Sequence, residues 1–221
     1  MQPETAAQHD PTLAHHFESH RQQHEASLVG MWAFLAQEVM FFGGMFLAYT
    51  VYRHLHPEAF VVGSLTLDPV YGTINTAVLI VSSLTMALAV RSAQLGRGKQ
   101  AALWIGGTAL AAGIFLVIKG VEYSHKYHDG LIPNFAWHPS ETSAPSLEIF
   151  YSFYFVLTGT HALHMIVGVA LMAVVAIRAL RGRYGPSNYI GVEVLGLYWH
   201  FVDLVWIFLF PLFYLLGRHL G

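Results

Sequence analysis

Long apolar stretches separated by shorter polar ones make up most of this chain. A helix needs about 20 apolar residues to cross the roughly 30 Å hydrocarbon core of a bilayer. Segments that meet this requirement lie at about residues 28–52, 70–90, 101–121, 147–177 and 190–216. The pattern predicts an all-α, polytopic membrane protein, with five transmembrane helices in a membrane domain from residue 28 to residue 217.

Composition supports a membrane protein and excludes several other classes. Of the 221 residues, 55% are hydrophobic and only 11% are charged, against roughly 25% charged in ordinary soluble domains. The formal net charge of −2 gives no reason to expect a nucleic-acid partner. The chain has no cysteine, which excludes disulfides, thiolate metal sites and cysteine nucleophiles.

Residues 1–27 form a polar tail that is rich in histidine. It lacks the basic start and apolar run of a signal peptide, and its acidic residues count against a transit peptide. Weak metal binding is one interpretation, and a solvated tail that partly docks on a partner is the other. The second is favoured because the histidine spacings match no fixed-geometry metal site. These histidines are His9, His15, His16, His20 and His24.

The distribution of Lys and Arg predicts which end of the chain faces the cytoplasm. With five spans, the tail and the two tight turns lie on one side of the membrane. That side carries Arg21, Arg91, Arg97, Lys99, Arg178, Arg181 and Arg183, whereas the other carries Arg53, Lys119, Lys126 and Arg218. Because cytoplasmic loops carry an excess of cations, this asymmetry predicts that the N-terminus lies inside.

Polar side chains occur at the middle of three spans, where they are costly. Glu38 lies in the first span, His161 and His164 in the fourth, and His200 and Asp203 in the last. The alternating directions of the spans bring all five side chains to a similar depth. We therefore expect a single buried polar cluster, because buried charges pair or become neutral.

Several roles for this cluster remain open from the residues alone. The His and Asp side chains favour a structural role that fastens helices together. Glu38 is a candidate proton-handling group, since burial favours the neutral form of a carboxyl. His161 or His164 with His200 could also ligate a haem, as in the haem-binding membrane anchor of a quinone reductase. A free-standing proton carrier fits less well, because the chain has no internal repeat.

Four motifs resemble subunit III of the haem-copper oxidases, and they cover nearly the whole membrane domain. In chain order they are Trp32–Phe42 around Glu38, the Glu122-Tyr123 pair, Thr158–His164 followed by Gly168, and Tyr198–Trp206. The long mitochondrial form of this subunit has two further spans at the front. The polar tail in their place makes this chain similar to the five-span bacterial form.

The resemblance implies an accessory subunit of a respiratory oxidase, with no metal and no redox cofactor of its own. The haems and copper would belong to partner subunits, with subunit I as the main contact and subunit II nearby. It also implies bound phospholipid, support of proton uptake, and a place in the bacterial inner membrane. Glu38 would be the family's intramembrane acid, with Glu122 and Tyr123 at the membrane interface. A cytochrome c oxidase is favoured, while a quinol oxidase or a nitric oxide reductase stays open as the setting.

Overall fold

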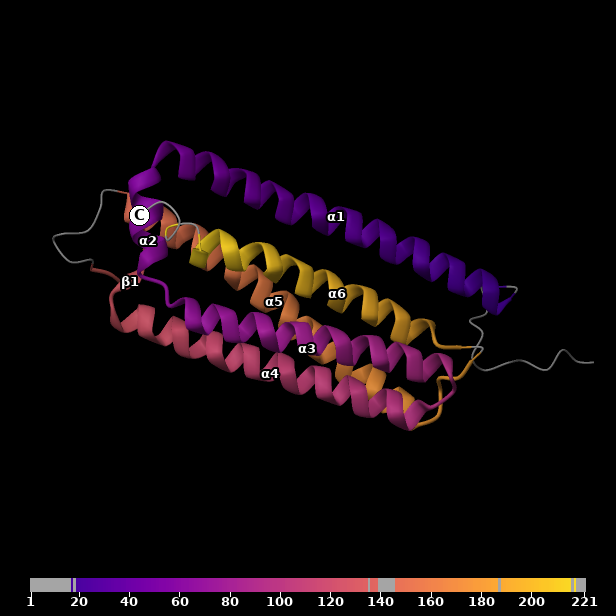
Figure 1. Ribbon diagram of the computed structural model, residues 1–221. Helices are drawn as coiled ribbons and strands as arrows, with labels where there is room; N and C mark the ends of the chain where they lie inside the picture. Colours follow the sequence, from indigo (N-terminus) through magenta and orange to yellow (C-terminus); the bar gives the residue numbers. More distant parts are fainter. Residues whose placement is uncertain are drawn as a thin grey trace, which may run out of the picture.

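The computed structural model describes residues 17, 19–134, 136–138, 146–186, 188–215 and 217. Within these residues, five helices are long and apolar enough to cross a membrane, which confirms the predicted fold class. They are α1 (His20–Leu55), α3 (Pro69–Gln94), α4 (Gly98–His128), α5 (Leu147–Leu180) and α6 (Ile190–Phe210), and α6 continues into a π-helical turn, η1 (Pro211–Leu215) (Figure 1).

The connections between these helices carry the remaining short elements. Helix α2 (Pro57–Leu65) follows α1, and strands β1 (Leu131–Ile132) and β2 (Ala136–Trp137) form an antiparallel pair between α4 and α5. Helix α2 was not expected from the sequence, because the loop between the first two spans shows no long apolar run. Pro57 in its first turn is compatible with a helix start.

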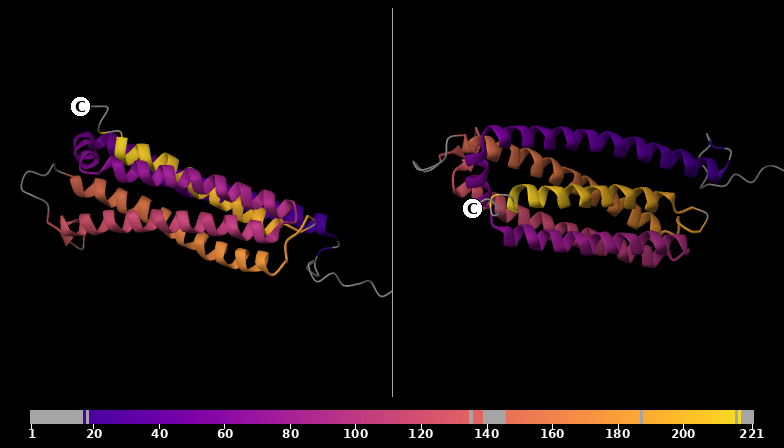
Figure 2. Two further views of the ribbon diagram at one scale, coloured as in Figure 1. Left: turned by 60° about the horizontal axis from the view of Figure 1, so that its bottom comes forward. Right: turned by 45° about the horizontal axis from the view of Figure 1, so that its top comes forward.

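Four of the long helices form a closed bundle, and the fifth lies on its outside. Helix α3 contacts α4 and α6, and α5 likewise contacts α4 and α6, whereas α1 contacts mainly α6. Figures 1 and 2 show α1 running along one side of the bundle, separate from α3 and α4. Helix α6 therefore occupies the middle of the molecule, between α1 and the other three long helices.

The helices extend beyond the predicted spans where capping residues allow it. Helix α1 begins at His20, eight residues before the expected span, because the Ser19 hydroxyl accepts a hydrogen bond from the Gln22 amide at 3.2 Å. Its first turns are held by His24, whose Nε2 lies 2.9 Å from Oε2 of Glu193 at the start of α6. Part of the histidine-rich tail is thus helical, while His9, His15 and His16 lie outside the described residues.

The two ends of the bundle differ in the charges that they carry. The tight turn between α3 and α4 contains Gly96 at φ 73°, a left-handed conformation that glycine adopts without strain.

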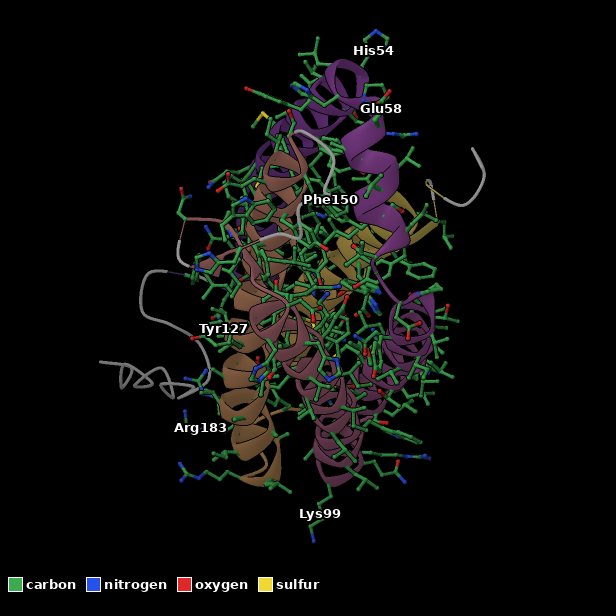
Figure 3. All side chains as sticks on the ribbon, turned by 90° about the vertical axis from the view of Figure 1, so that its left-hand side faces the viewer. His54, Glu58, Lys99, Tyr127, Phe150 and Arg183 are labelled. Carbon is green, nitrogen blue, oxygen red and sulfur yellow. The ribbon has the colours of Figure 1, made fainter. Side chains whose placement is uncertain are left out.

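Lys99 follows this turn, and Arg183 follows α5 at the same end of the bundle. In Figure 3 these two side chains lie toward the bottom, whereas His54 and Glu58 lie at the top.

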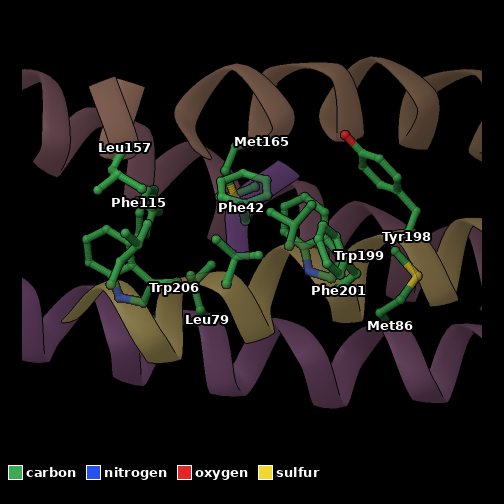
Figure 4. Packing of buried hydrophobic residues seen from close by; sticks show 14 of the residues in the cluster. Phe42, Leu79, Met86, Phe115, Leu157, Met165, Tyr198, Trp199, Phe201 and Trp206 are labelled. Carbon is green, nitrogen blue, oxygen red and sulfur yellow. The ribbon is translucent and has the colours of Figure 1, made fainter. Parts of the chain in front are cut away.

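Aromatic side chains on α6 that face the surrounding helices form part of the core. Trp199 and Trp206 are fully buried, and Trp206 meets Phe115 of α4 edge to face at 4.7 Å between ring centroids. Figure 4 shows these rings between α5 and α3. The most apolar stretch of α6 is 56% buried against 22% for α1, so α6 is the element around which the bundle is organised.

Candidate functional site: buried polar groups of the bundle

Glu38 and His164 form a contact between α1 and α5. Oε2 of Glu38 lies 3.2 Å from Nε2 of His164, and both side chains are mostly buried. Nδ1 of His164 lies 2.8 Å from the carbonyl oxygen of Thr160. A carbonyl can only accept a hydrogen bond, so Nδ1 must carry hydrogen. Nε2 of His164 therefore faces Oε2 of Glu38 without an aligned hydrogen bond, since this buried oxygen has no hydrogen-bond partner among the described residues.

His161 lies one turn earlier on α5 in an aromatic environment. Its ring centroid is 5.5 Å from that of Phe115 and 5.4 Å from that of Trp206. Neither ring nitrogen has a hydrogen-bond partner among the described residues. A three-residue step on a helix turns a side chain by about 60° from the starting direction, which directs His161 into the bundle and His164 toward α1.

His200 and Asp203 lie on the side of α6 that faces α3. Nδ1 of His200 lies 2.8 Å from the hydroxyl oxygen of Ser83. Both residues line a groove of about 380 Å³ between the two helices, as the sequence spacing predicted for side chains on one helix face. The carboxylate oxygens of Asp203 are buried and make no hydrogen bond with any described residue.

The contacts of these five residues divide them among three environments, where the sequence analysis expected one cluster. Helix α6 stands between α3 and α1, so its polar side chains face α3 while Glu38 reaches α5. The similar depth of these residues along the membrane normal stays a prediction from topology. The direction in which each side chain points around its helix axis depends on bundle packing, which the sequence pattern does not fix.

A second set of charged groups is buried inside the bundle and was not expected. Lys119 Nζ lies 3.0 Å from Glu122 Oε2 and donates hydrogen bonds to the hydroxyls of Tyr154 and Tyr214, each at 3.0 Å. Both tyrosine hydroxyls in turn donate to Glu122 Oε1, at 2.8 and 2.6 Å. We name Lys119, Glu122, Tyr154 and Tyr214 the charged core cluster.

The charged core cluster changes the interpretation of the last turns of α4. The sequence analysis assigned Glu122 and Tyr123 to the membrane interface because α4 was expected to end near residue 121. The helix continues to His128, and Glu122 is buried inside the bundle. Tyr123 is partly buried against the core and makes a hydrogen bond of 2.5 Å with the Thr158 hydroxyl. The signal available in the sequence was the three-residue spacing of Lys119 and Glu122, which places them on one helix face.

The three intramembrane histidines do not have the arrangement of a haem site. A bis-histidine haem needs two imidazoles that face one another from different helices. His164 is directed to Glu38 and to its own backbone, His200 to Ser83, and His161 lies against two aromatic rings. In the part of the chain that the structure describes, no group of three His, Asp or Glu side chains is placed to hold a metal ion.

Comparison with known proteins identifies the family. A family model for cytochrome c oxidase subunit III matches residues 12–218. The cytochrome bo(3) ubiquinol oxidase subunit 3 of Pseudomonas aeruginosa is 31% identical over 86% of this chain and 85% of its own length. The cytochrome c oxidase subunits 3 of Corynebacterium diphtheriae and Synechocystis are 32% and 34% identical, over 84% and 89% of this chain and 86% and 78% of their own lengths. These matches confirm the resemblance that the four motifs indicated: the chain belongs to the cytochrome c oxidase subunit III family of the haem-copper oxidases.

Proposed function

We propose that this chain is a non-catalytic subunit that stabilises the catalytic subunit I of a respiratory haem-copper oxidase, supports its proton uptake and binds lipid. Family membership implies association with the other oxidase subunits, which carry the haems and copper. The observation that supports the proton-handling role is the Glu38–His164 contact, in which a carboxyl group and an imidazole ring face one another at 3.2 Å inside the membrane domain.

The position of this contact suits proton exchange with a neighbouring subunit. Glu38 lies on α1, the helix outside the four-helix bundle, where its side chain is 10% exposed and that of His164 is 17% exposed. A carboxyl deep inside the bundle would have no route for proton release. At the edge of the bundle, Glu38 is close to whatever surface covers α1 in the assembled oxidase.

The lipid-binding role has a suitable surface between α1 and α6. A groove of about 190 Å³ there is lined almost entirely by apolar side chains, including Phe42, Phe46, Phe201 and Phe208. Such a surface complements a lipid acyl chain rather than a polar ligand. The exposed side chains of Met40 and Leu47 extend the apolar surface along α1.

The orientation and setting are part of the same proposal. The cationic turns after α3 and α5 support an N-terminus on the cytoplasmic side, as part of the proposal that the protein lies in the bacterial inner membrane. The relatives include subunits of both cytochrome c oxidases and quinol oxidases. The electron donor of the assembled oxidase could therefore be cytochrome c or a quinol. We favour a cytochrome c oxidase with subunits I and II as partners, as the sequence analysis did.

The test is the composition of the complex that an affinity-tagged chain brings down from membranes in a mild detergent. We expect a large polytopic subunit with bound haem and copper, and mass spectrometry of the other subunits will distinguish the donor class. A flavoprotein with an iron–sulfur protein would instead support a quinone-reductase anchor and overturn the proposal. For proton uptake, the complex with Glu38→Gln should turn over more slowly or inactivate sooner than wild type. Unchanged turnover would remove Glu38 from the proposed pathway.

A further inference from the structure

The groove between α3 and α6 combines an apolar rim with a polar floor. Its rim includes Leu84 of α3 and Ile207 of α6, both well exposed. Its floor carries Ser83, His200 and Asp203. Soluble proteins would solvate such a floor with water. In a membrane-spanning bundle the same surface faces either lipid or another protein.

The polar floor is incompletely satisfied within this chain. Both carboxylate oxygens of Asp203 are buried without an aligned hydrogen bond, with the hydroxyls of Ser82 and Ser83 beside them. The neighbouring hydroxyl of Ser82 donates to the Leu79 carbonyl, and that of Ser83 is paired with Nδ1 of His200. Nε2 of His200 makes no hydrogen bond with any described residue and is not buried. His200 therefore presents a free ring nitrogen to the groove, three residues from the buried carboxyl group of Asp203, which has no aligned hydrogen bond.

Lipid is a poor source of the missing partner. Asp203 is 13 residues after the start of α6 at Ile190, about 20 Å along the helix at 1.5 Å per residue. The membrane-crossing helix ends at Leu215, so His200 and Asp203 lie near its middle. Lipid headgroups, which hold the hydrogen-bonding atoms, lie outside the roughly 30 Å hydrocarbon layer. Acyl chains that filled the groove would leave the polar floor without a partner.

We propose that this groove is the docking site for a transmembrane helix of another oxidase subunit, which presents a polar side chain to His200 and Asp203 at mid-membrane. The inference rests on the proposed function, because it needs a partner subunit. Polar side chains between helices favour association in membranes, and small residues allow close approach. Ser83 and Ala87 supply small side chains on the α3 wall of the groove. An acid and an imidazole together select a partner residue that can donate a hydrogen bond.

The sequence contains no cysteine, so a single introduced cysteine is the only site in this chain that a maleimide crosslinker labels through a thiol. Single cysteines at Leu84→Cys and Ile207→Cys are labelled with a photoactivatable maleimide in native membranes, irradiated and analysed by mass spectrometry. Leu110→Cys, an exposed apolar position on α4, serves as the control for chance collision in the bilayer. We expect both groove positions to give adducts with a different oxidase subunit in higher yield than the control.

The inference is overturned if the groove cysteines give only lipid adducts, adducts with a second copy of this chain, or no more subunit adduct than Leu110→Cys. If the chain still copurifies with the oxidase in that case, the docking inference is wrong but the proposed function is not contradicted. Failure to copurify with any oxidase subunit overturns both. The two failures are therefore distinguishable.

Substitution of the floor gives an independent measurement. Asp203→Leu should speed dissociation of this chain from the detergent-solubilised complex by roughly three- to twenty-fold, the range of interhelical polar contacts in membrane proteins. Asp203→Asn, which keeps a hydrogen-bonding oxygen, should dissociate close to the wild-type rate. Equal dissociation rates for the wild type and both variants would argue against the docking site. If Asp203→Leu does not fold, the crosslinking result decides alone.

Discussion

Lys119 Nζ lies 3.0 Å from Glu122 Oε2, with both side chains only 4% exposed. The hydroxyls of Tyr154 and Tyr214 complete the surroundings of both charges. Through these four side chains α4, α5 and the η1 turn meet at one point. A buried ion pair is costly to form but also costly to break, because removal of one partner leaves the other charge uncompensated. The charged core cluster therefore fixes how these three elements fit together.

Replacement of the lysine alone should destabilise the protein strongly. We expect Lys119→Met to lower the free energy of unfolding by about 3–5 kcal/mol, because Glu122 stays buried without its cation. The double variant Lys119→Met/Glu122→Leu should recover a large part of this loss. Reversible unfolding in mixed micelles provides the measurement, with Val117→Met at an exposed position of α4 as the control. Wild-type stability for Lys119→Met would mean that the pair contributes nothing to the fold.

The sequence predicted the number and order of the long helices because hydrophobic length alone determines them. It also placed His200 and Asp203 on one face of α6, since helical periodicity suffices for that. It did not predict that Glu38 meets His164 while His200 meets Ser83, because the rotation of each helix about its axis depends on its neighbours. It missed the charged core cluster for a related reason. Lys119 and Glu122 near the end of an apolar run look like interfacial residues until the tyrosines of α5 and η1 are placed around them.

Gly168 allows α5 and α6 to approach closely. A Cβ atom at this position would lie 2.9 Å from the Trp199 ring and 3.2 Å from that of Tyr198. We expect Gly168→Ala to cost about 1–3 kcal/mol of stability through overpacking. Gly159→Ala on the same helix is the matched control, because its added Cβ would meet only the Tyr123 hydroxyl, at 3.9 Å. Thermal unfolding of the two variants side by side tests this. A similar melting temperature for both would show that the α5–α6 interface relaxes freely around position 168.

The Ser83–His200 hydrogen bond should make a modest contribution within the chain. Substitution of His200 by Leu would be damaging if it left a buried partner unpaired. In the structure that partner is a serine hydroxyl, which can turn to a backbone carbonyl of its own helix. A double-mutant cycle of Ser83→Ala and His200→Phe should give a coupling energy of about 0.6 kcal/mol and no more than about 1.7 kcal/mol. A coupling several times larger would indicate that His200 also holds Asp203 in place.

Glu38 provides a test that separates a structural role from a proton-handling role. Because Nε2 of His164 lies 3.2 Å from Oε2 of Glu38, a glutamine amide at position 38 can donate to the same nitrogen and keep the contact. Glu38→Gln should therefore assemble into the oxidase at the wild-type level, as judged by the amount of this chain retained after detergent purification. Glu38→Leu offers no donor and should be retained less well, since Nε2 of His164 is left without a partner. If Glu38→Gln fails to assemble as Glu38→Leu does, the negative charge itself is required for the fold. An ion pair between Glu38 and His164 would then bind α1 to α5, and the proton-handling role would be lost.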